Sequence, residues 1–85
     1  MEIKICGITN RPDALAAADA GADALGFIFY PGSPRFIPPE QAREIINRLP
    51  PGIAAVGVFV NSAPEEILRV AAFVGLTMVQ LHGDE

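Results

Sequence analysis

The sequence alternates between short apolar runs typical of buried strands and longer segments typical of helices, and this alternation strongly limits the possible folds. Strand-like runs are expected at 3–6, 23–30, 54–61 and 77–82, and helices at 12–20, 40–49 and 64–74. Strands joined by helical crossovers predict a parallel sheet with right-handed connections. Residues 1–85 therefore form one βαβαβαβ unit, with no expected linker or second domain.

Two α/β folds fit this order, the open doubly wound sheet and the (β/α)8 barrel. The sequence has neither Gly-x-Gly-x-x-Gly nor a P-loop signature, which removes the main support for the nucleotide-binding open sheets. Each expected strand ends in a polar or small residue: Cys6, Tyr30, Asn61 and His82. This pattern suits a TIM barrel, in which every strand contributes to one site at its carboxyl end.

A complete barrel needs roughly 200 residues or more, so four strands predict its first half. Such a half leaves the first and fourth strands as open edges, which invite pairing with another chain. We also expect it to expose phenylalanine, isoleucine and valine side chains on its inner face, where a complete barrel packs them in layers.

Composition limits the partners and the compartment. The net charge is −4 and no cluster of lysine and arginine is present to contact phosphates, which argues against nucleic acid. No apolar run approaches the roughly 20 residues of a membrane helix, so no membrane association is expected. There is no leader of secretory type, and a single cysteine cannot form an internal disulfide. We expect a cytoplasmic protein.

The single cysteine, Cys6, lies where the first strand ends and a loop leads into a helix. That helix is marked by a capping side chain, Thr9 or Asn10, and by Pro12 in its first turn. In parallel α/β folds, this edge of the sheet is where ligands bind. Cys6 is therefore either a catalytic thiol or an inert core residue of the kind common in small domains.

Four segments together resemble the amino-terminal half of the phosphoribosylanthranilate isomerases, enzymes of tryptophan biosynthesis. They are K-I-C-G-I-T-N at 4–10, G-F-I-F-Y-P-G-S-P-R-F-I at 26–37, V-G-V-F-V-N at 56–61 and Q-L-H-G-D-E at 80–85. The resemblance implies a (β/α)8 barrel that performs an Amadori rearrangement of a small phosphosugar-anthranilate substrate without a metal or an organic cofactor. N-(5-phosphoribosyl)anthranilate would become 1-(2-carboxyphenylamino)-1-deoxyribulose 5-phosphate.

The resemblance also implies roles for individual residues. Cys6 matches the cysteine that acts as the general base in the family, and Arg35 matches the arginine that contacts the anthranilate carboxylate. A guanidinium can hold a carboxylate through two parallel hydrogen bonds, whereas a loop arginine is otherwise simply solvated. Lys4 lies on the same face of the strand as Cys6. It either stabilises the thiolate, which is the reactive form of cysteine, or pairs with an acid inside the barrel.

The remaining polar residues near the strand ends have weaker assignments. His82, the only histidine, either contacts substrate or shapes the site through hydrogen bonds. Asn61 is interpreted as the cap of the third helix, with Ser62 as the alternative. Asp84 and Glu85 are interpreted as a solvated turn or helix start. In the family, the general acid is an aspartate on a later strand, and amides of the last two βα loops hold the phosphate.

Three functional hypotheses follow. The first is the isomerase. The second is a catalytically incomplete half-barrel module that self-associates or needs a complementary half. The third is a different enzyme of the phosphate-binding barrels, which the combination of Cys6 with the S-P-R motif at 33–35 disfavours.

Overall fold

The fold was analysed in a computed structural model that describes the backbone of residues 2–82 and the side chains of residues 2–81. Strands and helices alternate along these residues. They are β1 Lys4–Cys6, α1 Arg11–Asp19, β2 Ala24–Ile28, α2 Pro39–Asn47, β3 Ala54–Val60, α3 Pro64–Val74 and β4 Met78–His82. The βαβαβαβ order expected from the sequence is confirmed, although β2 ends at Ile28, before the expected Tyr30.

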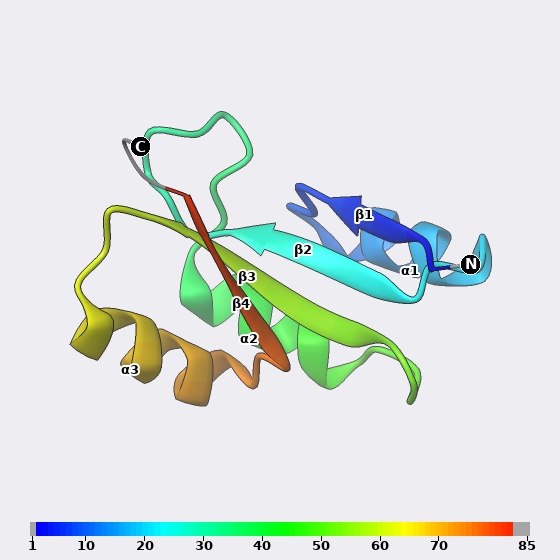
Figure 1. Cartoon of the computed structure of the whole chain (residues 1–85). Coiled ribbons are helices and arrows are strands. Elements are labelled where there is room, and N and C mark those ends of the chain that lie inside the picture. Colours follow the sequence, from blue (N-terminus) through cyan, green and yellow to red (C-terminus); the bar gives the residue numbers. More distant parts are fainter. Residues whose placement is uncertain (1, 83–85) are drawn as a thin grey trace.

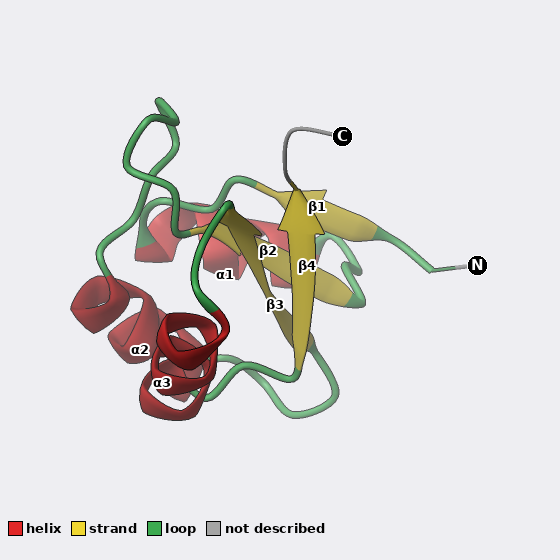
Figure 2. Cartoon of the chain, turned by 60° about the vertical axis from the view of Figure 1, so that its left-hand side comes forward, coloured by secondary structure: helices red, strands yellow, loops and turns green. Residues whose placement is uncertain are grey.

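The strands form one parallel sheet in the order β1-β2-β3-β4. The three helices cover one face of this sheet, and its other face carries no helix of the described chain (Figures 1 and 2). The register pairs Cys6 with Gly26, Gly26 with Val56, and Val56 with Met78, so these four residues lie in one row across the sheet. Because side chains alternate along a strand, residues in one row point to the same face.

The core lies between the sheet and the helices. Strand side chains such as Leu25, Phe27 and Phe59 are almost fully buried there, and the Phe29 and Phe59 rings lie 5.4 Å apart. The helices contribute small or branched residues at helical spacing: Ala14 and Ala17, Ala42 and Ile45, and Val70 and Val74. The expectation that phenylalanine would be exposed on the inner face is wrong, because Phe27 and Phe59 point toward the helices.

The helix-free face is concave and partly polar. Lys4 and Cys6 of β1 point to this face, as does Gln80 of β4, and the Lys4 ammonium donates a hydrogen bond to the Gln80 side-chain oxygen. This bond joins the two edge strands across the sheet. Val56 and Val58 of β3 point to the same face and are buried, so the expectation of exposed valine there is also wrong, whereas Met78 is 59% exposed.

The two sheet edges also expose apolar side chains toward the helix side. Ile5 of β1 is 36% exposed, and Val79 and Leu81 of β4 are exposed as well. By contrast, equivalent residues of the central strands, such as Leu25, are fully buried. The edges therefore lack the cover that the helices give to the middle of the sheet.

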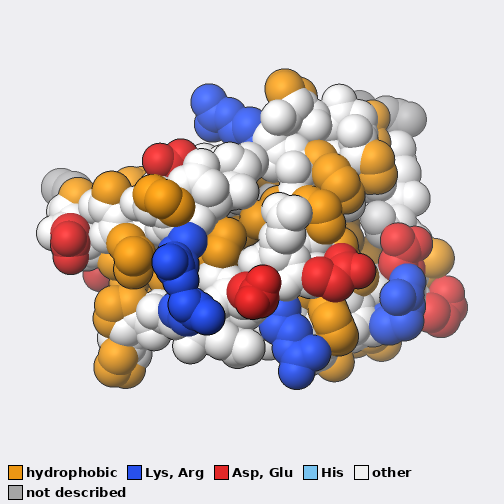
Figure 3. Space-filling model, turned by 180° about the vertical axis from the view of Figure 1, so that it is seen from behind, with side chains coloured by type: hydrophobic (Ala, Val, Ile, Leu, Met, Phe, Trp, Pro, Cys, Tyr) orange, Lys and Arg blue, Asp and Glu red, His pale blue; other side chains and the backbone are white. Residues whose placement is uncertain are grey.

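Seen from behind, the molecule shows acidic and basic side chains interspersed with apolar ones, without a large basic patch on that face (Figure 3). Among the described residues, no helix has both the length and the apolar character to cross a bilayer.

The predicted N-cap is found at the start of α1 but not at the start of α3. Asn10 caps α1: its side-chain oxygen accepts the Asp13 N–H at 2.8 Å, and its amide donates to the Asp13 carboxylate at 3.0 Å. The expected capping of α3 by Asn61 or Ser62 is wrong. Ala63 holds the N-cap position, and α3 begins directly with Pro64, which has no N–H to satisfy.

We predict that Asn10→Ala lowers the free energy of unfolding by about 1 kcal/mol, the usual cost of a lost N-cap. Urea unfolding followed by circular dichroism measures the change. Ser62→Ala is the matched control, because Ser62 also precedes a helix but does not cap it. That variant should stay within about 0.5 kcal/mol of the parent protein. Equal losses in the two variants would contradict the assignment.

Candidate active site at the carboxyl end of the sheet

The loop after β1 is held by one carbonyl group of β2. The N–H groups of Gly7 and Ile8 both donate to the Gly26 oxygen, at 3.0 and 3.1 Å. Gly7 has φ +89°, a left-handed conformation that glycine adopts without strain. Ile8 then enters the core, where it is 4% exposed. The chain therefore turns sharply straight after Cys6, and this turn fixes the backbone that carries the thiol.

The Cys6 side chain lies against Gly26, its register partner on β2. A Cβ atom added to Gly26 would fall 2.7 Å from the Cys6 sulfur and 3.1 Å from the Cys6 Cα. Both distances are shorter than van der Waals contact. The Cys6 sulfur therefore occupies space that the side chain of any other residue type at position 26 would need. Cys6 is free and exposed, which excludes the interpretation as a buried core residue.

Arg35 comes from the loop between β2 and α2, which projects beyond the carboxyl end of the sheet (Figure 1). The loop is folded by turns: the Ser33 N–H donates to the Tyr30 oxygen at 3.0 Å, and the Arg35 N–H donates to the Ser33 hydroxyl oxygen at 3.1 Å. Buried Ile37 anchors its far end, with its N–H donating to the Ile28 oxygen.

The Arg35 side chain crosses over Gly7. A Cβ atom on Gly7 would lie 2.6 Å from the Arg35 Cδ and 2.9 Å from its Nη1. The guanidinium therefore lies over the residue that directly follows Cys6, although 29 positions separate Cys6 from Arg35 in sequence. Cys6, the predicted base, and Arg35, the predicted ligand of the anthranilate carboxylate, therefore lie at the same end of the sheet.

Cys6, Gly7 and Arg35 line one cavity of about 580 Å³, along with residues of α1 and Pro34. The cavity opens at the free edge of β1. It combines a thiol, which can act as a base or nucleophile in its ionised form, with a cation suited to a carboxylate or phosphate. Among the described residues, no cluster of histidine, cysteine and acidic side chains could hold a metal ion.

The other predicted site residues do not line the cavity that contains Cys6 and Arg35. Lys4 points to the concave face as expected, but its hydrogen-bond acceptor is the Gln80 amide rather than an acid. His82 is the last residue of β4 and lies two positions after Gln80 on that strand. Its side chain lies outside the described residues. Asp84 and Glu85 also lie outside them. Asn61 follows β3 with φ 51°.

Sequence reasoning missed the close approach of Cys6 to Gly26 and of Arg35 to Gly7. A signal was present: Gly26 interrupts an apolar strand, and a glycine inside a strand often marks a close approach. Its partner could not be identified from the sequence, because the register between β1 and β2 was unknown.

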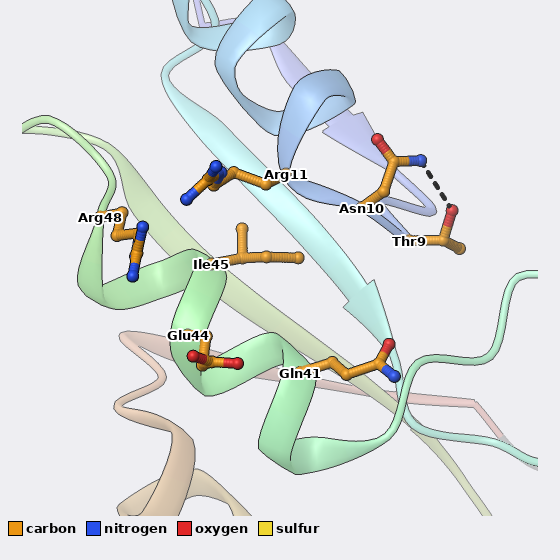
Figure 4. Close-up of a pocket in the computed structure, with 7 residues that line it drawn as sticks. All are labelled: Thr9, Asn10, Arg11, Gln41, Glu44, Ile45 and Arg48. Carbon is orange, nitrogen blue, oxygen red and sulfur yellow. Dashed lines mark hydrogen bonds between the residues drawn. The ribbon is translucent and has the colours of Figure 1, made fainter.

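A second cavity, of about 300 Å³, lies between the start of α1 and the length of α2 (Figure 4). Arg11 and Arg48 extend toward it from the two helices, and Gln41, Glu44 and Ile45 complete its α2 wall. The Asn10 amide turns instead toward the Thr9 hydroxyl, at 3.4 Å. In the described part of the chain, this cavity is lined by neither cysteine nor histidine, and the sequence singled out none of its α2 residues as a site residue.

The parallel sheet, the helices on one face and the polar side chains at the strand carboxyl ends are those of part of a βα barrel. Comparison with known proteins gives the family: residues 3–85 match the family model of N-(5'-phosphoribosyl)anthranilate (PRA) isomerase. The chain belongs to this family.

Individual relatives agree with this assignment. The isomerase of Syntrophus aciditrophicus is 62% identical over 84 residues, which cover 99% of this chain and 36% of the relative. The crystal structure of the Thermotoga maritima isomerase is 59% identical, with a TM-score of 0.97, and covers 100% of this chain. A solved isomerase in complex with reduced 1-(o-carboxyphenylamino)-1-deoxyribulose 5-phosphate is equally similar, with TM-score 0.97 and 59% identity.

These relatives confirm the TIM-barrel class, and they are much longer than the chain. The chain spans 42% of the Thermotoga maritima structure and 44% of the structure with the bound phosphosugar derivative. The described strands therefore correspond to part of a barrel.

Proposed function

We propose that the chain is the amino-terminal half of a single (β/α)8 barrel domain that isomerises N-(5-phosphoribosyl)anthranilate in tryptophan biosynthesis. One observation carries the proposal: Cys6 and Arg35, which are 29 positions apart in sequence, line one cavity beside the turn that follows β1. Family membership and the phosphosugar derivative bound by a relative support it.

In the proposed reaction, protonation of the ring oxygen opens the furanose to an iminium ion. The Cys6 thiolate then removes the proton from the neighbouring sugar carbon. The electron pair of that C–H bond moves toward the iminium nitrogen, and the resulting enolamine becomes the aminoketose. Substrate and product have the same formula, so the reaction as written requires no external oxidant or reductant. The acid would come from the remainder of the barrel.

Arg35 would bind the carboxylate of the anthranilate ring. Its place over Gly7 puts that carboxylate beside the residue that follows the base. Lys4 and His82 would contribute from the concave face. The Lys4 ammonium, held by Gln80, would add positive charge on the face to which Cys6 points. A free, exposed cysteine also fits a reducing compartment, which supports a cytoplasmic location.

A second candidate, a half-barrel module that requires another half, is favoured by the uncovered edges. Ile5, Val79 and Leu81 are exposed on the helix side of β1 and β4, and Met78 is exposed on the concave face. Pairing β1 and β4 with further strands would cover them, and four strands plus four strands make a closed barrel. Those strands would come from the rest of a longer polypeptide or from a second chain.

The role of Cys6 predicts that Cys6→Ala in a complete barrel lowers turnover by at least about a hundredfold, the scale of general-base catalysis. Cys6 is exposed and lies outside the core, so the fold should be unaffected. Steady-state kinetics, with circular dichroism as the control for folding, measure the effect. Near-normal turnover in a folded variant would remove Cys6 from the mechanism.

The role of Arg35 predicts that Arg35→Lys weakens binding of the anthranilate-bearing substrate by about 1.5–3 kcal/mol, the scale of hydrogen bonds to charged groups. Lysine keeps the charge but loses the two-pronged geometry. Titration with the reduced product analogue reports the affinity directly. Arg43→Lys is the matched control, because Arg43 lies over the Phe73 ring, away from the site. Equal affinities for all three proteins would refute the role.

The open edges predict that the isolated 85-residue polypeptide self-associates or aggregates unless a complementary half is present. It should also lack isomerase activity, because the acid and the phosphate loops of the family belong to the other half. Sedimentation velocity over a range of concentrations and a fluorescence assay of substrate consumption test the two statements. A stable monomer with measurable turnover would overturn both.

A further inference from the structure

We propose that Gly7 and Gly26 are positioning residues that set the distance between the Cys6 thiol and the Arg35 guanidinium. The inference deepens the proposed function, since it assigns the specificity-determining geometry of that same site. Neither glycine has a side chain that could touch substrate. Each acts by leaving open the space that one reactive side chain occupies.

Gly26 determines where the thiol points. The Cys6 sulfur lies 2.7 Å from the position that a Gly26 methyl group would take, and the Cys6 Cβ lies 3.2 Å from it. A cysteine side chain has three staggered rotamers. A methyl group at position 26 would close the present one and turn the sulfur into another, away from its place over β2. The Cys6 Cα lies 3.1 Å from the same position, so the β1 backbone would also have to shift by a few tenths of an ångström.

Gly7 determines where the guanidinium lies. A methyl group there would be within 2.9 Å of both Cδ and Nη1 of Arg35, and a long flexible side chain yields to such a contact by swinging away. Gly7 also has a positive φ, so alanine would add backbone strain of about 1–2 kcal/mol. A control must therefore separate the strain from the displacement of Arg35.

The chain offers two such controls. Gly52 has φ +92°, and nothing lies within 4 Å of its added Cβ, so Gly52→Ala brings strain without displacing a side chain. Gly57 is a buried glycine of β3, and its added Cβ would contact Leu76, Phe59 and Phe29 rather than the site. Gly57→Ala thus reproduces overpacking in a strand without touching Cys6 or Arg35.

The test uses Cys6 as a reporter in a complete barrel in which it is the single cysteine, with folding checked by circular dichroism. The Cys6 thiolate attacks an aryl disulfide: its sulfur forms a new S–S bond, the reagent's S–S bond breaks, and an aryl thiolate leaves with the electron pair. Rates are compared for a dicarboxylate reagent, 5,5'-dithiobis(2-nitrobenzoate), and a neutral one, 2,2'-dithiodipyridine. A nearby guanidinium favours the anionic reagent, which is itself an aryl carboxylate.

We expect the ratio of anionic to neutral rates at low salt to fall about tenfold in Arg35→Gln, through loss of local steering. Gly7→Ala and Gly26→Ala should lower the ratio to the same level, because each separates the thiol from the guanidinium. Gly52→Ala and Gly57→Ala should keep the parent ratio. The proposal is overturned if Gly7→Ala and Gly26→Ala keep the same ratio of anionic to neutral rates as the parent protein. It is also overturned if Arg35→Gln keeps that ratio.

Double variants keep the proposal testable if the single ones unfold. Cys6→Ala should restore part of the urea midpoint lost in Gly26→Ala, because it removes the sulfur that lies nearest the added methyl group. Arg35→Ala should likewise restore part of the midpoint lost in Gly7→Ala, because it removes the Cδ and Nη1 atoms. Additive losses in both cycles would show that the contacts do not exist and would refute the proposal.

Kinetics in a complete barrel distinguish this proposal from the proposed function. If the glycines act as stated and the isomerase assignment holds, Gly26→Ala lowers kcat and Gly7→Ala raises KM for the anthranilate-bearing substrate. If the rate ratios fall as expected while kcat and KM stay unchanged, the glycines do position both side chains, and the roles of Cys6 and Arg35 in catalysis are wrong.

Discussion

The structure depends on the parallel pairing of its four strands. Each strand must be followed by a crossover that returns the chain to the opposite end of the sheet, and all three crossovers are helices on the same face. This arrangement puts the core between the helices and the sheet, where Leu25, Phe27 and Phe59 are buried. It also brings the carboxyl ends of the strands to one edge, so loops distant in sequence meet there.

The same constraint explains the unequal ends of the sheet. Central strands have neighbours on both sides and helices above them, whereas β1 and β4 have one neighbour each and leave Ile5 and Leu81 exposed. The hydrogen bond from Lys4 to Gln80 links these two strands across the concave face. In a closed barrel that face becomes an interior, where polar groups need partners. The bond thus satisfies two groups that closure would bury.

The proposed site arises from absent side chains as much as from present ones. The Gly26 carbonyl holds the turn after β1 through two hydrogen bonds, and its missing side chain makes room for the Cys6 sulfur. Gly7 permits the positive φ of that turn and leaves its outer surface open to Arg35. A single turn therefore has the Cys6 thiol on one side and the Arg35 guanidinium over it.

The sequence by itself determined the order of elements, because apolar runs and glycine or proline breaks depend on local chemistry. The motifs around Cys6 and Arg35 identified the family, because each is a short run of consecutive residues that can be read without the fold. Local signals failed at the start of α3, where Ala63 holds the N-cap position and no side chain caps the helix. Only the tertiary structure decided which face each strand residue occupies, that Lys4 reaches Gln80, and that Arg35 lies over Gly7. These facts depend on strand register and loop path, which involve residues distant in the chain and leave no local pattern.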